Sequence, residues 1–419
     1  MLTDIFSRTS VLTKLEAGPF GPYLPDLATA LQQQRYATDT IQQYLHSADA
    51  FGRWLKTQKI SPSAINEDII AQYVSSLKRR KVPSRLYGAP PHEAGGLKHL
   101  LCLLRQQNIV TPSHPVTAAT PSEQALSEYD QYLERTAGVA AGTRRKYLYF
   151  ARQFLAFAFA SAIPEWSLLR AETVTAFVQK ETAPRQGAGR KHPASATRIF
   201  LRYLVTRGLI PAGLEAVIPR GRLWKHASLP EHLSAEEISH VLEACADGTA
   251  IGKRNYAILL LLSRLGIRAL EAAQLQIDDV DWRTGCILIR ASKNHRERNL
   301  PLSEDVGQAL LDYLRDGRPR TDSRNIFLEH TAPFHPLQTS SAITKAVKRL
   351  LKKTGIERRS SGAHLFRHTA ASQMVCHGAT FKEVADVLGH QSLQTTGIYA
   401  KLDLAALSQV ALPWPGGAQ

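Results

Sequence analysis

Four separated stretches in the C-terminal part of the chain contain residues that could act on a phosphate. In the first, GIRALEAAQL, a glycine ends one predicted helix and an arginine begins the next. The second is a lysine in a polar turn between two predicted strands, and the others are HLFRHT and LGHQSLQTTGIYAKL. Their candidate catalytic side chains are Arg268, Lys293, His364, Arg367, His390 and Tyr399.

A pocket that gathers these cations would favour phosphoryl transfer. Guanidinium groups such as those of Arg268 and Arg367 bind the non-bridging oxygens of a phosphate with paired hydrogen bonds. They also stabilise the charge that develops in the transition state, and losing one such donor typically costs about 3 kcal/mol. A phenol has an ordinary pKa near about 10, and nearby positive charge makes it easier to ionise. Tyr399 is therefore the candidate nucleophile.

Taken singly, each residue also has an ordinary structural explanation. Arg268 could pair with Glu271 one turn away, and Lys293 could be a solvated lysine in a region it shares with Arg296 and Arg298. The histidines could be polar helix residues, and the tyrosine a half-buried aromatic residue of the core. The catalytic interpretation is favoured because the whole set occurs in order.

The two histidines of HLFRHT have zinc-like spacing, but their neighbours argue against a metal. His364 and His368 lie four residues apart on one predicted helix face. A metalloprotease motif needs glutamate directly after the first histidine, where this chain has Leu365. Arg367 beside the pair would repel a cation. We therefore do not expect these histidines to bind zinc.

The composition indicates a polyanionic partner. The 419 residues include 52 Lys and Arg against 36 Asp and Glu, a formal net charge of +16. Such an excess is typical of proteins that bind nucleic acid or an acidic membrane surface. The apolar runs are too short to span a membrane, and the N-terminus lacks the pattern of a secretory signal. Four dispersed cysteines indicate a reducing compartment, so we expect a cytoplasmic protein without a membrane partner.

The first 225 residues carry 13 of the 16 excess positive charges and contain an apparent duplication. TIQQYLHSADAF (40–51) aligns with TRRKYLYFARQF (143–154), and LLCLLRQQNIV (100–110) aligns with FLRYLVTRGLI (200–210). Each copy has apolar residues at three- and four-residue spacing, which predicts a small helical unit. Two unrelated amphipathic regions with similar spacing are the alternative to a duplication.

A different pattern begins near residue 228. Ser234 and Glu237 form a capping box that begins a helix. The segment DDVDWRTGCILIRASKNHRERNLPL predicts a turn, a strand over 286–291, a polar turn and a second strand near 298–302. We expect a mainly α chain with a small antiparallel sheet in its last part. The predicted domains are residues 1–115, 116–215 and 228–419, the last including a C-terminal tail.

Together, these motifs resemble the tyrosine recombinase (phage integrase) family. GIRALE is similar to its first arginine box, and HLFRH is similar to its H-x-x-R-H box. The family's lysine, LGH histidine and nucleophile match Lys293, His390 and Tyr399. The resemblance covers most of residues 116–410 and is strongest over 250–405. It implies a helical, SAM-like core-binding domain followed by a catalytic domain, without metal or ATP.

The resemblance also implies a role for each residue. Tyr399 would attack the scissile phosphorus, which forms a 3′-phosphotyrosine and releases a 5′-hydroxyl. Arg268 and Arg367 would hold the non-bridging oxygens, and His390 would add a hydrogen bond.

The two remaining residues would move protons. Lys293 would protonate the leaving oxygen, and His364 would serve as base or orienter for the tyrosine. Two changes from the common boxes, Leu270 and Phe366, are interpreted as packing changes. The larger departure is residues 1–115, which we interpret as a second copy of the core-binding unit.

These implications favour a site-specific DNA recombinase of a mobile element that performs integration, excision or transposition. In the family, strand exchange occurs in a synaptic tetramer on double-stranded DNA, sometimes with other recombinases. The C-terminal tail would pack between protomers or onto its own domain. A topoisomerase IB-like nicking-closing enzyme is one alternative, and a non-catalytic, sequence-specific DNA-binding accessory protein is another. The presence of Arg268, Arg367 and Tyr399 speaks against the second.

Overall fold

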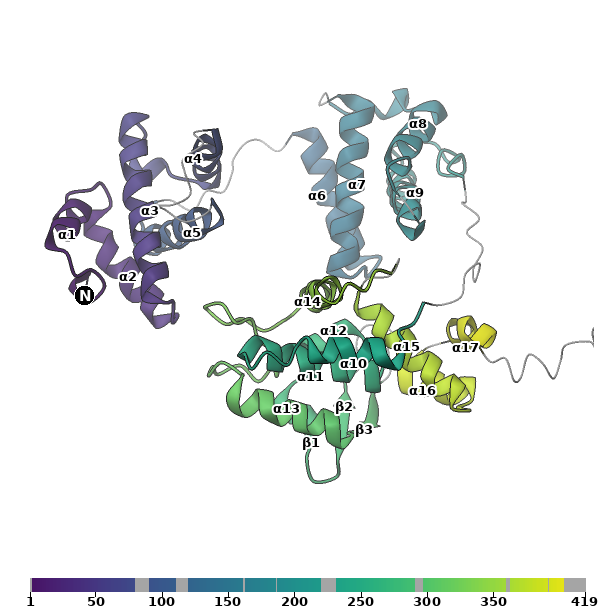
Figure 1. The fold of residues 1–419 in the computed structure, drawn as a ribbon. Coiled ribbons are helices and arrows are strands. Elements are labelled where there is room, and N and C mark those ends of the chain that lie inside the picture. The colour runs from purple at the N-terminus through teal and green to yellow at the C-terminus, as the bar shows by residue number, and fades with distance from the viewer. Residues whose placement is uncertain are drawn as a thin grey trace, which may run out of the picture. The chain divides into compact units, whose positions relative to one another are not determined.

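The computed structural model of the chain is mainly helical (Figure 1). It describes residues 2–79, 90–110, 120–160, 163–185, 187–219, 231–290, 297–358, 362–390 and 392–402. Residues 111–225 form one compact unit, and the rest of the chain forms the other. That second unit contains separate hydrophobic cores for its N-terminal and C-terminal parts. None of the described helices is long and apolar enough to cross a membrane.

The N-terminal core is built by helices that each bury one apolar face. Leu24, Leu27 and Leu31 recur at three- and four-residue spacing along α2 and are all buried. The long helix α3 packs against α2 and α5. The helices are α1 (Thr9–Glu16), α2 (Leu24–Gln33), α3 (Thr38–Thr57), α4 (Glu67–Arg79) and α5 (Pro90–Gln106).

The unit of residues 111–225 repeats this plan. Thr120 caps its first helix by accepting a hydrogen bond from the backbone N–H of Glu123. The core lies between the helices and contains Tyr129, Phe154 and Phe200. The helices are α6 (Pro121–Arg135), α7 (Ala141–Phe159), α8 (Ala171–Thr182) and α9 (Lys191–Thr206).

The helices α2 to α5 correspond in order to α6 to α9. A short 3-10 helix precedes the third member of each set, at Pro62–Ala64 and at Trp166–Leu168. The buried positions also correspond, and the pairs include Leu31 and Leu133, Phe51 and Phe154, Tyr73 and Phe177, and Leu104 and Leu204. Similar apolar patterns at the same places in both sets produce the same helical plan.

The C-terminal part surrounds a helix that is apolar on nearly every side. This helix, α11, buries Ala257 to Ser263 without interruption and packs against α13 and α15. A continuous apolar surface is typical of a helix at the centre of a domain. The helices of this part are α10 (Ala235–Glu243), α11 (Ala250–Arg264), α12 (Ala269–Gln274), α13 (Glu304–Asp316), α14 (Ser340–Lys353), α15 (Ala363–Cys376), α16 (Phe381–Leu388), α17 (Leu393–Thr396) and the 3-10 helix η7 (Gly397–Leu402).

A three-stranded antiparallel sheet accompanies these helices. The strands β1 (Val280–Asp281), β2 (Cys286–Ile289) and β3 (Arg298–Pro301) pair in chain order. The predicted fold class, mainly α with a small antiparallel sheet, is confirmed, and so is the capping box of α10. The sequence predicted a turn where β1 lies, because two residues are too few to show the alternation of a strand.

Candidate active site

Two glycines allow the arginine boxes and the LGH box to approach one another. Gly266 follows α11 with a φ of +60°, and a Cβ atom there would lie 2.6 Å from Leu388 Cδ2. Gly389 ends α16 with a φ of +62°, and a Cβ atom there would lie 2.8 Å from Arg298 Nη1. Left-handed backbone with such close neighbours favours glycine. The end of α16 therefore lies directly against the turn that begins α12.

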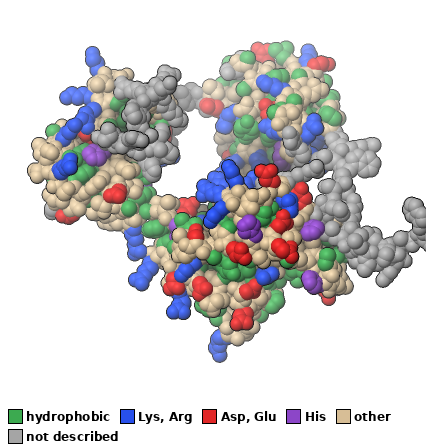
Figure 2. Space-filling view, viewed as in Figure 1, with side chains coloured by type: hydrophobic (Ala, Val, Ile, Leu, Met, Phe, Trp, Pro, Cys, Tyr) green, Lys and Arg blue, Asp and Glu red, His purple; other side chains and the backbone are tan. Residues whose placement is uncertain are grey.

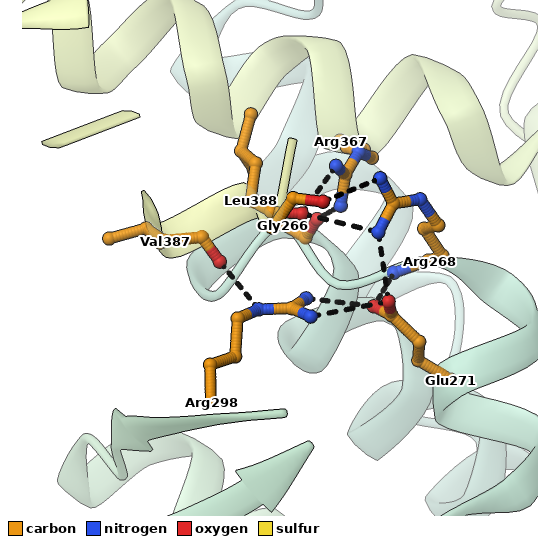
Figure 3. A network of polar contacts seen from close by, with 8 residues as sticks. Gly266, Arg268, Glu271, Arg298, Arg367, Val387 and Leu388 are labelled. Atoms are coloured by element: carbon orange, nitrogen blue, oxygen red, sulfur yellow. Dashed lines mark hydrogen bonds and ion pairs between the residues drawn. The ribbon is translucent and has the colours of Figure 1, made fainter. Parts of the chain in front are cut away.

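A buried carboxylate holds two arginines from different elements (Figure 3). Arg268 Nη1 donates to Glu271 Oε1 at 2.9 Å, and Arg298 Nη2 donates to Glu271 Oε2 at 2.8 Å. The Glu271 side chain is only 3% exposed. Burial favours its neutral form, but the hydrogen bonds and charges of the two arginines outweigh burial, so the pKa of Glu271 is lowered. Glu271 thus remains charged and fixes both guanidinium groups.

The end of α16 supplies carbonyl oxygens to both arginine boxes. Arg367 Nη2 donates to Leu388 O at 2.7 Å, and its Nη1 donates to Gly266 O at 2.6 Å. Arg268 donates to Leu388 O at 3.3 Å and to Gly389 O at 3.1 Å. Carbonyls at a helix C-terminus carry partial negative charge and are natural acceptors for cations. The LGH box therefore positions the arginines besides providing a histidine.

Arg367 is almost completely enclosed by these contacts. It is 4% exposed. Burial, followed by the charge of Arg268, lowers the pKa of Arg367 to about 9, and this still leaves the guanidinium charged at neutral pH. The positive charge of Arg268 beside Arg367 is tolerated because the carboxylate of Glu271 offsets it.

A cleft of about 440 Å³ opens beside these arginines. Three elements line it with polar and cationic groups, and no acidic side chain is among its described lining residues. Its polar lining comes from Arg268, Ser340, Thr344, Lys348, His364 and Arg367. A concave surface of this composition suits a phosphate. Figure 2 shows Lys and Arg side chains gathered over α14, the helix that contributes Lys348.

The candidate nucleophile is buried in an apolar setting. Tyr399 is 1% exposed and belongs to a small cluster with Val375, Val384 and Leu388. Its hydroxyl forms a 2.7 Å hydrogen bond with Nδ1 of His368. Burial raises the pKa of Tyr399 to about 12, although the charge of Arg367 acts in the opposite direction. The phenol therefore retains its proton in the free chain.

The remaining predicted residues occupy different positions around the site. His390 forms a 2.8 Å hydrogen bond with the hydroxyl of Thr396, which fixes the start of the segment that carries the tyrosine. Burial, and then the charge of Arg367, lowers the pKa of His390 to about 4. His364 is exposed and lines the cleft. Lys293 lies outside the residues that the structure describes.

The structure adds two residues to the site that no motif contained, and it changes the partner that the motif gave to the tyrosine. The sequence assigned His364 to the tyrosine, whereas the structure bonds the tyrosine to His368, the second histidine of the same box. Four-residue spacing from His364 was the available signal. Arg298 and Lys348 lacked such a signal, because each is brought to the site only by the fold. In the described part of the chain, no group of three histidines, cysteines or carboxylates could hold a metal.

Comparison with known proteins agrees with this geometry. Residues 231–405 match the phage integrase family. The integrase/recombinase y4rA of Sinorhizobium fredii is 36% identical over 97% of this chain and 98% of its own length. The chain belongs to the phage integrase family. It is thus a tyrosine-type, site-specific DNA recombinase, and its enzymatic class is that of the DNA strand transferases.

Two further proteins are similar to this recombinase, one in sequence and one in fold. The tyrosine recombinase XerC of Lacticaseibacillus casei is 29% identical over 67% of this chain and 95% of its own. The XerH recombinase, solved on its palindromic difH substrate, superposes with a TM-score of 0.55 and 20% identity over 81% of this chain and 93% of that chain. The second similarity concerns the fold alone. The alignment with XerC leaves about a third of this chain uncovered.

Proposed function

We propose that this recombinase cuts and rejoins DNA through a covalent 3′-phosphotyrosine intermediate formed by Tyr399. One observation carries the proposal. Arg268 and Arg367 bond to the same carbonyl of Leu388, and Tyr399 lies in the apolar cluster that contains this leucine. A phenol and two guanidinium groups thus all lie near the end of α16. Their proximity supports attack by the phenol on a phosphodiester that the two arginines hold.

The scissile phosphate would bind in the cleft. Arg268 and Arg367 would donate to its non-bridging oxygens and stabilise the charge of the pentacovalent transition state. His364, which faces the same cleft, would donate a further hydrogen bond. His390 would add a hydrogen bond to the phosphate through its other ring nitrogen, because its Nδ1 is bonded to Thr396.

Attack by Tyr399 on phosphorus would form the O–P bond and break the bond to the 5′ oxygen. Lys293 would deliver a proton to that leaving oxygen. The covalent bond preserves the energy of the phosphodiester, so a 5′-hydroxyl from a second strand can restore it without ATP. Because Tyr399 is 1% exposed in the free chain, DNA binding must open a path to its hydroxyl.

The middle unit offers a surface suited to the DNA backbone. Arg145, Tyr149 and Arg152 recur along one side of α7 and are all exposed, Tyr149 by 50%. Interleaved basic and aromatic side chains suit contact with sugars and phosphates. Arg144 is occupied by ion pairs with Asp130 and Glu134. This unit, residues 116–215, would serve as the core-binding domain.

Residues 1–115 would be a second copy of that unit. The correspondence of α2 to α5 with α6 to α9, in helix order and in buried positions, supports this proposal. The copies differ at the α7 surface. The counterparts on α3 are Gln42, His46 and Asp49. Gln42 donates to Ile5 O and the His46 ring contacts Phe6, both in the first segment of the chain, while Asp49 pairs with Arg53. The first copy must therefore contact DNA through another surface.

Removing residues 1–115 is expected to weaken DNA binding and to reduce its salt dependence. These residues carry 13 Lys and Arg against 8 Asp and Glu. The slope of log affinity against log salt falls by about 0.9 for every phosphate that the shortened chain no longer neutralises. Binding titrations of the shortened and full chains at several salt concentrations measure the slope. An unchanged slope would contradict the role given to this unit, provided that the remaining chain keeps its thermal transition.

The biological task would be integration, excision or transposition of a mobile element. Strand exchange would take place in a synaptic tetramer of this chain, or together with other recombinases, on two duplexes. The tail expected to link the protomers begins at Leu402, the last described residue, and its other apolar residues, Leu404, Leu407 and Val410, lie outside the described residues.

Incubating the chain with two copies of its DNA site is expected to give recombinant duplexes. The expected reaction needs no ATP and proceeds in EDTA, because the proposed chemistry uses side chains alone. The products are measured by the exchange of labelled flanks between the two sites. Relaxation of supercoils without exchange would indicate a nicking-closing enzyme instead, and binding without cleavage would indicate an accessory protein.

A further inference from the structure

We propose that His368 positions the Tyr399 hydroxyl and takes its proton as the phenol attacks, an inference that rests on the proposed function. His368 follows Arg367 directly on α15, so one helix supplies both a phosphate ligand and the partner of the nucleophile. The sequence motif assigned this task to His364. The contacts in the structure assign the tyrosine to His368 and the cleft to His364.

The tyrosine is held firmly against His368. The Oη to Nδ1 distance is 2.7 Å, and the ring centroids lie 5.8 Å apart at an interplanar angle of 56°. The phenol ring is enclosed by Ala371, Val375 and Val384, which leaves it 1% exposed. A buried ring with a hydrogen bond at its only polar atom has little freedom to rotate. The position of the hydroxyl is therefore set by the imidazole.

The other histidine faces the phosphate instead. His364 lines the cleft together with Arg268 and Arg367, and it is exposed. Its ring centroid lies 6.0 Å from that of His368, one helical turn away. The two imidazoles thus have separate tasks: His364 serves the substrate, and His368 serves the nucleophile.

The protonation states allow the transfer. Burial, and then the neighbouring charges of His364 and Arg367, lowers the pKa of His368 to about 4, so it is neutral and can accept at neutral pH. With the imidazole hydrogen on Nε2, Nδ1 accepts the hydrogen bond from the phenol. A phosphodiester in the cleft brings a negative charge that favours an imidazolium.

The proposed step is balanced in atoms and charge. The phenolic proton moves to Nδ1 of His368 while the phenol oxygen forms its bond to phosphorus. The bond from phosphorus to the 5′ oxygen breaks, and Lys293 protonates that oxygen. In the reverse step, the imidazolium returns its proton to the departing phenolate.

Two substitutions of His368 distinguish its two proposed functions, which are positioning the Tyr399 hydroxyl and accepting the proton of that hydroxyl. His368→Asn places an amide oxygen near the position of Nδ1, so it can accept the hydrogen bond but not the proton. His368→Ala removes both functions. Single-turnover formation of the covalent adduct on a nicked suicide substrate is measured across a range of pH. His377→Ala is the matched control, because His377 lies exposed at the end of the same helix.

We expect the unsubstituted chain to react at a rate that is nearly independent of pH above neutrality. His368→Asn should react about 100-fold more slowly at neutral pH, and its rate should rise about tenfold per pH unit as hydroxide replaces the missing base. His368→Ala should be slower still at every pH. The control should match the unsubstituted chain.

Other outcomes would overturn the inference. A rate and pH profile of His368→Asn equal to those of the unsubstituted chain would show that His368 accepts no proton. An equal loss at every pH, without the steeper slope, would show a purely structural role. If the unsubstituted chain itself formed no adduct, the proposed function would fail first, and that result is distinguishable because it appears before any substitution.

Discussion

Tyr399→Phe is expected to abolish the covalent protein–DNA adduct and leave DNA binding nearly unchanged. The substitution removes only the attacking oxygen, and the ring stays in its apolar cluster with Val375, Val384 and Leu388. The loss of one hydrogen bond to His368 costs about 1 kcal/mol of stability. Adduct formation is measured on denaturing gels, and binding by mobility shift on the same DNA.

The two readouts of this variant should diverge. Phenylalanine has no oxygen that could attack phosphorus, so even prolonged incubation should give no adduct. Affinity should stay within about threefold, because the phenol does not touch the phosphates of uncleaved DNA in the proposed mechanism. An adduct formed by the phenylalanine variant would assign the attack to another residue.

Arg367→Ala is expected to slow adduct formation by about 100- to 1,000-fold. Arg367 has two tasks, since its guanidinium would bind the phosphate and already binds the carbonyls of Gly266 and Leu388. Its removal takes away the side-chain donor of Gly266 O, leaves Leu388 O with the longer bond from Arg268, and loosens the contact between the end of α11 and the end of α16. The rate should therefore fall, and the thermal transition should fall by a few degrees.

Arg367→Lys tests the geometry of the charge separately. Lysine keeps the positive charge but cannot bridge two acceptors with a planar fork. We expect it to recover little of the rate. Arg264→Ala is the matched control, because Arg264 is a half-exposed arginine that pairs with Asp305 on the surface. Single-turnover rates within about threefold of the unsubstituted chain for Arg367→Ala would contradict the role given to this residue.

Local patterns were sufficient to predict much of the fold. The Ser234 capping box, the apolar run of α11 and the strand pair after residue 280 each correspond to a described element. These features depend on residues close together in the chain, where spacing determines structure. The motifs also indicated stretches that the structure brings together, since both arginine boxes bond to the end of α16 and Tyr399 bonds to the second box.

Features created by distant contacts could not be predicted in this way. Arg298 meets Glu271 across 27 positions, and its backbone partner Val387 lies 89 positions away. A sequence shows such an arginine only as one charge in a basic turn. The choice between His364 and His368 likewise depends on where η7 packs, which is a tertiary contact.

The most direct test of the central claim is to identify the residue that becomes linked to DNA. The adduct from a suicide substrate is digested with protease and nuclease, and the modified peptide is sequenced by mass spectrometry. We expect a nucleotide joined through its 3′ phosphate to Tyr399. Attachment at another side chain, or through a 5′ phosphate, would contradict the account.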